Sequence, residues 1–200
     1  MILTFFSMIV IFTLGGFSIL ASLIFATVLI LTTFLLGAIA VRVMGETGIE
    51  PVSGTSFIVL LMLLGVFLNA QNLLDLDTQD SILLGLVGTT VFGSAISMSG
   101  TVIGDYKNSL YIGNRPYHIS KGNIMGVVPG AIIGAAVAIF LSIQLAEGRI
   151  DLIAPQANAF ATFSVIFAEG QGDLYLLGLG FLLGMFVEWV TGMGTSFGLG

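Results

Sequence analysis

The side chains best able to do chemistry in this chain are a few charged groups placed at the ends of long apolar runs. Glu188 follows the charge-free stretch 174–187, and Asp105 and Lys107 follow the charge-free stretch 81–104. A charged side chain at the centre of a bilayer costs roughly 2.5 to 3.5 kcal/mol on insertion scales, so such residues tend to be functional. In a membrane these groups would contact a solute or carry a proton.

Each of these charged groups also has a structural interpretation. Glu188 precedes Trp189, whose ring suits a membrane interface, so the glutamate lies at a helix end, or within a helix where it meets another helix. Asp105 and Lys107 are two residues apart and therefore point to different sides of a helix, which also suits topology anchors. Glu46 stands among glycines, where it lines a turn or is solvated in a loop.

The composition is that of a multi-spanning membrane protein. Hydrophobic residues make up 56% of the chain, charged residues only 8%, and the mean hydropathy is +1.12. So few charges cannot cover the surface of a soluble domain of 200 residues. The net charge of −6 leaves no basic stripe to neutralise phosphates, which excludes a nucleic-acid partner.

The reactive residue types argue against an enzyme, a metal site and a bound cofactor. The chain has no cysteine and a single histidine, His118, so thiolate and histidine metal clusters are excluded. Residues 194–198 spell G-x-S-x-G, but the only histidine precedes this serine, whereas the triad histidine of that motif follows it. We predict a protein that is not an enzyme, with no metal and no cofactor.

Charge-free stretches predict where the chain crosses the bilayer, because one crossing needs about 20 apolar residues. These stretches are 1–41, 81–104, 122–146 and 174–187. The first is too long for one crossing and short for two. We therefore expect a turn near Gly15, Gly16 or Ser18, with an incomplete helix before it.

Two further apolar segments, 57–68 and 157–168, are too short to cross. Each follows a polar, proline-containing stretch, 49–56 and 154–158 respectively, which we call the polar approach segments. Short segments opened by proline or glycine often mark the binding region of a transporter, where half-helix ends face the solute. Alternatively, each approach segment is a plain loop, followed by a helix that is short or extended by polar residues.

The predicted fold is an all-α, polytopic transmembrane helix bundle of about six hydrophobic segments, two of them short and either spanning or re-entrant, in a single membrane domain over 1–200. Small residues four apart predict close helix contacts. They form the row Gly126, Gly130, Gly134 and Ala138, and the pairs Gly100 with Gly104 and Gly180 with Gly184.

The positive-inside rule gives an orientation in the cell membrane. Lys107, Arg115 and Lys121 lie within 105–121, which we predict to be a cytoplasmic loop. Arg42 then falls on the same side, and only Arg149 lies outside. The predicted protein is multi-pass.

Four motifs in order resemble the oligopeptide transporter family over about residues 38–200. They are GETGIEPVSG at 45–54, the pattern G-D-x-K-x-x-x-x-x-G-x-x-P at 104–116, A-P-Q-A at 154–157, and the glycine-rich start at 194–200. The stretch after Gly113 departs from the commoner family form.

The resemblance implies a secondary transporter built from two related halves that moves peptides or metal chelates with protons. The chain matches the later half, so we expect either a fragment of a longer polypeptide or a chain that needs a second subunit. We predict proton-coupled uptake of oligopeptides by alternating access. The alternatives are a metal-chelate, siderophore-like transporter of the same family and a non-transporting membrane scaffold or assembly subunit.

Five residues are the predicted contributors to solute contact, proton coupling or gating. They are Glu46, Asp105, Lys107, Gln156 and Glu188. The implied partners are the lipid bilayer, a small peptide or metal-chelate solute, and protons.

Overall fold

A computed structural model describes residues 2–48, 50–150, 154–170 and 174–191. Every regular element among these residues is a helix, which confirms the predicted all-α fold. Contacts between residues divide the chain into two compact units. The first unit comprises 1–100 and 156–200, and the second comprises 101–155.

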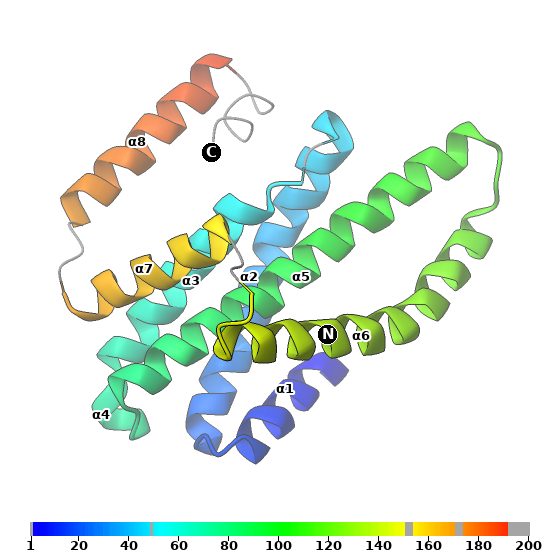
Figure 1. Cartoon of the computed structure of the whole chain (residues 1–200). Coiled ribbons are helices and arrows are strands. Elements are labelled where there is room, and N and C mark those ends of the chain that lie inside the picture. The colour runs from blue at the N-terminus through cyan, green and yellow to red at the C-terminus, as the bar shows by residue number, and fades with distance from the viewer. Residues whose placement is uncertain (1, 49, 151–153, 171–173, 192–200) are drawn as a thin grey trace. The chain divides into compact units, whose positions relative to one another are not determined.

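The helices of the described residues follow one another along the chain (Figure 1). They are α1 (Ile2–Leu14), α2 (Ile19–Thr47), α3 (Val52–Asn69), α4 (Gln71–Leu74), α5 (Thr78–Tyr111), α6 (Pro116–Ala146), α7 (Pro155–Ala168) and α8 (Leu174–Thr191). Four of them, α2, α3, α5 and α6, are long and apolar enough to cross a membrane. The predicted count of about six hydrophobic segments is therefore not confirmed.

The turn predicted within the first apolar stretch is present. Helix α1 ends at Leu14, Gly16 adopts a φ of 97°, and Ser18 caps α2 by accepting a hydrogen bond from the Ala21 amide at 3.2 Å. The 13 residues of α1 extend only about 20 Å, which is too short to cross a bilayer. Helix α1 instead packs against α2, where the ring centroids of Phe12 and Phe25 lie 4.0 Å apart.

The two polar approach segments behave differently. Helix α3 begins at Val52 and has 18 residues, so the prediction that 57–68 is too short to cross was wrong. Pro51 precedes the helix, where its missing N–H breaks no helical hydrogen bond, and the polar residues 53–56 extend the helix. Helix α7 has only 14 residues, starts at Pro155, and is not among the four candidate spans.

The core of the first unit lies where α2, α3 and α5 meet. Its buried side chains include Phe25, Leu63, Phe67 and Phe92. Three glycines of α5 allow α3 to approach closely, because a Cβ on any of them would lie 3.0 Å or less from a side chain of α3. These contacts join Gly85 to Leu64, Gly88 to Leu63 and Gly93 to Ser56. Residue numbers rise along α3 as they fall along α5, so the two helices are antiparallel.

The second unit joins the end of α5 to α6 through a tight turn. The predicted loop 105–121 was wrong in extent, since α5 continues to Tyr111 and α6 begins at Pro116. A charged residue does not stop a helix, and near an interface its side chain can still reach water. Gly113 provides the turn with a φ of 72°, and the hydroxyls of Tyr106 and Ser120 are hydrogen-bonded across it.

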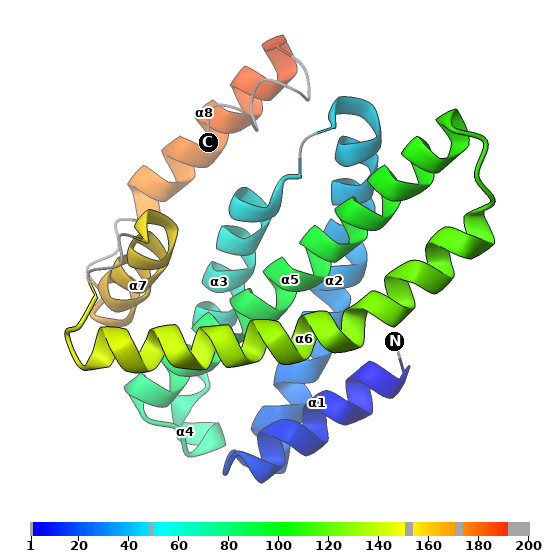
Figure 2. The ribbon, with the colours of Figure 1, turned by 45° about the vertical axis from the view of Figure 1, so that its right-hand side comes forward.

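Helix α6 is bent along its length (Figure 2). Pro129 lies inside it, and an interior proline removes a helical hydrogen bond and kinks the helix. A Cβ on Gly126, Gly130 or Gly134 would meet nothing within 4 Å among the described residues. The close helix contact predicted for this row, and for Gly180 with Gly184, therefore stays a prediction.

Candidate functional site

A cavity of about 410 Å³ lies between α3, α5 and α7, within the first unit. Its described lining carries hydroxyl, amide and apolar groups and no charge. The lining residues are Ser56, Leu86, Thr89, Thr90, Gly93, Ser94, Gln156, Ala157, Phe160 and Ala161. A mostly apolar cavity with a few converging polar groups is the usual form of a small-molecule site.

The two polar approach segments meet at this cavity. Pro155 begins α7 and so places Gln156 in its first turn. The Gln156 side-chain Nε2 donates a hydrogen bond of 2.8 Å to the Oγ of Ser53, in the first turn of α3. This bond joins residues 103 positions apart in the sequence and brings the beginnings of α3 and α7 together.

Aromatic rings hold α7 on α3 beyond this hydrogen bond. The ring centroid of Phe57 lies 4.8 Å from that of Phe163 in an edge-to-face arrangement, and 6.0 Å from that of Phe160. In both views α7 lies beside α3 (Figures 1 and 2). The cavity wall contributed by α7 is thus fixed by one polar and two aromatic contacts.

The hydroxyls of α5 that line the cavity already donate hydrogen bonds to backbone carbonyls of the same helix. Thr89 donates to the Gly85 carbonyl at 2.7 Å, Thr90 to the Leu86 carbonyl at 2.9 Å, and Ser94 to the Thr90 carbonyl at 2.9 Å. Each oxygen keeps its lone pairs, so the hydroxyls can accept hydrogen bonds from a solute. Gln156 donates one of its two amide N–H groups to Ser53, which leaves the second N–H as a donor and the carbonyl oxygen as an acceptor.

Ser56 is the exception among the hydroxyls of the cavity. Its side chain is only 4% exposed, and its Oγ has no hydrogen-bond partner among the described residues. A buried polar group left unpaired costs about 1–3 kcal/mol, so a hydrogen bond to a solute would be favourable if this side chain turned toward the cavity. Gly93 faces this oxygen, and a Cβ there would lie 3.0 Å from it, so the glycine leaves the hydroxyl room.

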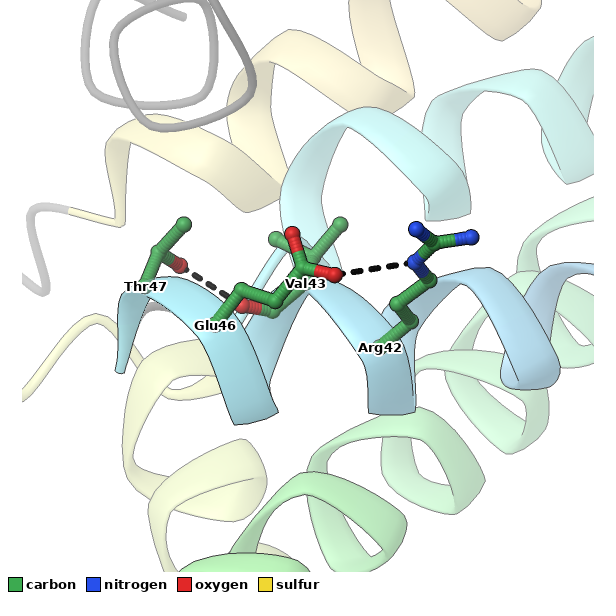
Figure 3. A network of polar contacts seen from close by, with 4 residues as sticks. All are labelled: Arg42, Val43, Glu46 and Thr47. Atoms are coloured by element: carbon green, nitrogen blue, oxygen red, sulfur yellow. Dashed lines mark hydrogen bonds and ion pairs between the residues drawn. The ribbon is translucent and has the colours of Figure 1, made fainter.

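The predicted site residue Glu46 lies away from this cavity. It occupies the last turn of α2, and its Oε1 accepts a 2.9 Å hydrogen bond from Nε of Arg42 in an exposed ion pair (Figure 3). The side chains of Arg42 and Glu46 are 73% and 48% exposed. Glu46 therefore lies within a helix and not in a loop, and its predicted role in solute contact, coupling or gating stays a prediction.

The other predicted residues lie elsewhere in the chain. Asp105 and Lys107 belong to the second unit, where both lie on α5. Glu188 lies on α8, but its side chain is outside the described residues, as is the G-x-S-x-G string at 194–198. Of the five predicted side chains, Gln156 alone lines the described cavity.

Glu50 was not among the predicted site residues, although it lies in the polar approach segment 49–56. Ser97 of α5 donates a 3.1 Å hydrogen bond to Glu50 Oε2, and the same carboxylate rests against Gly100. The available signals were a glutamate beside Pro51 in that approach segment and, separately, the pair Gly100 and Gly104, for which a close helix contact had been predicted. Only tertiary structure shows that the two meet.

A family model described as OPT oligopeptide transporter protein matches residues 1–193. The chain belongs to the oligopeptide transporter family. Together with the apolar helices, this membership makes it a multi-pass membrane protein of a transporter family. The curated proteins and the solved structures that were compared with it gave no match.

The oligopeptide transporter match is wider than the motifs had suggested. The motifs indicated a resemblance over about 38–200, whereas the family model also covers α1 and the first part of α2 and ends before the fourth motif at 194–200. Every described element that forms the cavity, α3, α5 and α7, lies inside the match. The A-P-Q-A motif of the family resemblance contains Gln156, which links α7 to α3.

Proposed function

We propose that this chain belongs to a proton-coupled secondary transporter that takes up short peptides by alternating access, with the cavity between α3, α5 and α7 as its solute site. The observation that carries the proposal is the unpaired Ser56 hydroxyl in a cavity where Gln156 and Ser53 join the two polar approach segments. A helix too short to cross, such as α7, whose start faces a solute is typical of binding regions in transporters.

The hydrogen-bonding character of the cavity favours a peptide over a metal chelate. The hydroxyls of Thr89, Thr90 and Ser94 and the Gln156 carbonyl offer acceptors. A peptide brings backbone N–H groups and a terminal ammonium, which are donors. A chelate rich in carboxylates brings several negative charges that need cationic partners, and the described lining carries no charge.

Proton coupling is proposed for charged groups outside this lining. Asp105, Lys107 and Glu188 are the proposed coupling residues, and Glu46 is proposed to act in gating at the end of α2. Lys107→Ala should then lower uptake without lowering membrane insertion. Unchanged uptake by this variant would remove Lys107 from the proposal.

The experiment is uptake of short peptides into proteoliposomes, with and without an inwardly directed proton gradient. We expect accumulation that depends on the gradient, and little accumulation of a chelated ferric ion. Accumulation of the chelate alone would replace the peptide proposal, and failure of correctly inserted protein to accumulate either solute would favour the scaffold interpretation.

A pair of matched variants ties uptake to the cavity. Thr90 and Thr27 are both exposed threonines whose hydroxyls donate to the carbonyl four residues earlier, but only Thr90 lines the cavity. Loss of one acceptor for the solute is worth about 1.4 kcal/mol, so Thr90→Val should raise the KM for peptide about tenfold. Thr27→Val should leave KM unchanged. Equal KM values in both variants would place the solute elsewhere.

A further inference from the structure

Glu50 occupies the short connection between two helices that are each long enough to cross a membrane. Helix α2 ends at Thr47, where Gly48 provides a left-handed cap with a φ of 73°, and α3 begins at Val52. A carboxylate in such a connection could simply extend into water. Glu50 instead is only partly exposed and turns toward α5.

The carboxylate fits a notch on α5 that exists because residue 100 has no side chain. A Cβ on Gly100 would lie 2.9 Å from Glu50 Oε1, 3.0 Å from its Cγ and 3.1 Å from its Cδ. Ser97, one turn earlier on α5, donates its hydroxyl to Oε2 at 3.1 Å. The notch thus fits the shape of the side chain, and Ser97 uses one of its acceptor oxygens.

The notch lies directly before the residues that build the cavity. Val52, the first residue of α3, lies against Gly93 of α5, where a Cβ would be 3.7 Å from its Cγ1. Ser53 then accepts the hydrogen bond from Gln156, and Ser56, one turn later, is a lining residue of the cavity. Where Glu50 docks therefore determines where α3 starts relative to α5.

We propose that Glu50 is a positioning residue whose side chain, held in the Gly100 notch by Ser97, fixes the start of α3 and so places Ser53 and Ser56 at the cavity. That Ser53 and Ser56 serve solute binding rests on the proposed function. The docking itself does not. Glutamine has the same shape and keeps an acceptor oxygen, so it should replace Glu50, whereas alanine should not.

The docking is tested by disulfide formation, which requires no solute. The chain has no cysteine, so the double variant Val52→Cys, Gly93→Cys contains the only thiol pair. A Cβ on residue 93 would lie 3.7 Å from the Cγ1 position that the new sulfur at residue 52 can take, so the two sulfurs can reach each other. The 3.0 Å approach of that Cβ to Ser56 Oγ is common to the parent and to every variant compared with it. We expect Glu50→Gln to cross-link within about twofold of this parent. Glu50→Ala and Gly100→Ala should cross-link about tenfold more slowly, as loss of about 1.4 kcal/mol of docking requires.

Two results would overturn the proposal. If Glu50→Gln cross-links as slowly as Glu50→Ala, charge rather than shape holds the side chain. If all variants cross-link like the parent, Glu50 does not position α3. Gly100→Ala keeps every charged group of the chain, so it decides the question even if Glu50→Ala fails to insert in the membrane.

Transport kinetics supply a second readout with a matched control. Ser97 and Ser99 are neighbouring serines of α5, and only Ser97 bonds Glu50, while Ser99 bonds the Ile96 carbonyl. Ser97→Ala should raise the KM for peptide several-fold with little change in kcat, and Ser99→Ala should change neither. Intact cross-linking behaviour without uptake in any variant would reject the peptide-transport proposal while leaving the role of Glu50 in place.

Discussion

Helices α5 and α6 both carry glycines at helical spacing, and within the first unit those of α5 lie against α3. A Cβ on Gly85 or Gly88 would collide with Leu64 or Leu63 of α3. A Cβ on Gly126 or Gly130 of α6 would meet no described atom of the second unit within 4 Å. Small residues at helical spacing therefore identify a face that permits close approach, but they do not identify the partner.

The largest effect on stability is expected when a large side chain replaces Gly88, the most crowded glycine of α5. A Cβ at Gly88 would lie 2.4 Å from Leu63 Cδ1 and 2.9 Å from Phe25 Cε2, and both of these side chains are fully buried. We expect Gly88→Leu to lower the free energy of unfolding by about 3 kcal/mol or more, because overpacked cores cannot relax freely. Thermal unfolding of the purified protein in detergent measures this change.

Gly130→Leu on α6 is the matched control, because it adds the same side chain at a position where no described atom of the second unit lies within 4 Å. We expect no loss of stability from it. If Gly130→Leu is as damaging as Gly88→Leu, a helix does pack on the row Gly126, Gly130 and Gly134. The original prediction of close contact there would then be right.

Substitution of a glycine by alanine should change the free energy of unfolding in opposite directions on the two helices. Gly85→Ala places a Cβ 2.9 Å from Leu64 Cδ2, and this clash should outweigh the gain in helix propensity of up to about 1 kcal/mol. Gly126→Ala should have the propensity gain alone. We expect destabilisation by about 1 kcal/mol for the first and a neutral or stabilising effect for the second, again by thermal unfolding. If both substitutions changed the stability in the same direction, the glycines of α5 and α6 would not differ in their packing.

Much of the fold could be predicted because lipid imposes simple rules on sequence. The turn at Gly16 and Ser18 followed from the length of the first charge-free stretch alone. The rule failed where helices continue past polar or charged residues. Ser53 and Ser56 lie inside α3, and Asp105 and Lys107 lie inside α5, because side-chain polarity does not prevent backbone hydrogen bonding within a helix.

The candidate site was only partly predictable for a different reason. Gln156 was found because it follows a proline, and that is a local signal. Glu50 and Ser56 were not found, since what distinguishes them is the glycine that each faces on a helix distant in sequence, Gly100 and Gly93. Local patterns give faces and ends of helices, whereas the pairing of two faces is a tertiary property.

The contact between α7 and α3 differs from that between α5 and α3, because aromatic rings rather than glycines form it. Phe57→Leu keeps most of the apolar bulk but removes the ring contacts with Phe160 and Phe163. We expect a loss of about 0.5–1 kcal/mol in the free energy of unfolding, since aromatic pairs contribute this much beyond the area they bury. Phe34→Leu, at an exposed ring of α2, is the control and should be neutral. Equal effects would mean that the rings do not anchor α7.

The smallest expected effect concerns the exposed carboxylate near the end of α2. Glu46 pairs with Arg42 at 2.9 Å, but both side chains are solvent-exposed, so water and salt weaken their attraction. We expect Glu46→Gln to leave the melting temperature within experimental error, at low and at high salt. A clear drop at low salt would show that the pair stabilises the end of α2. Unchanged stability with reduced uptake would instead support the proposed gating role of Glu46, because the substitution would then affect transport without affecting the fold.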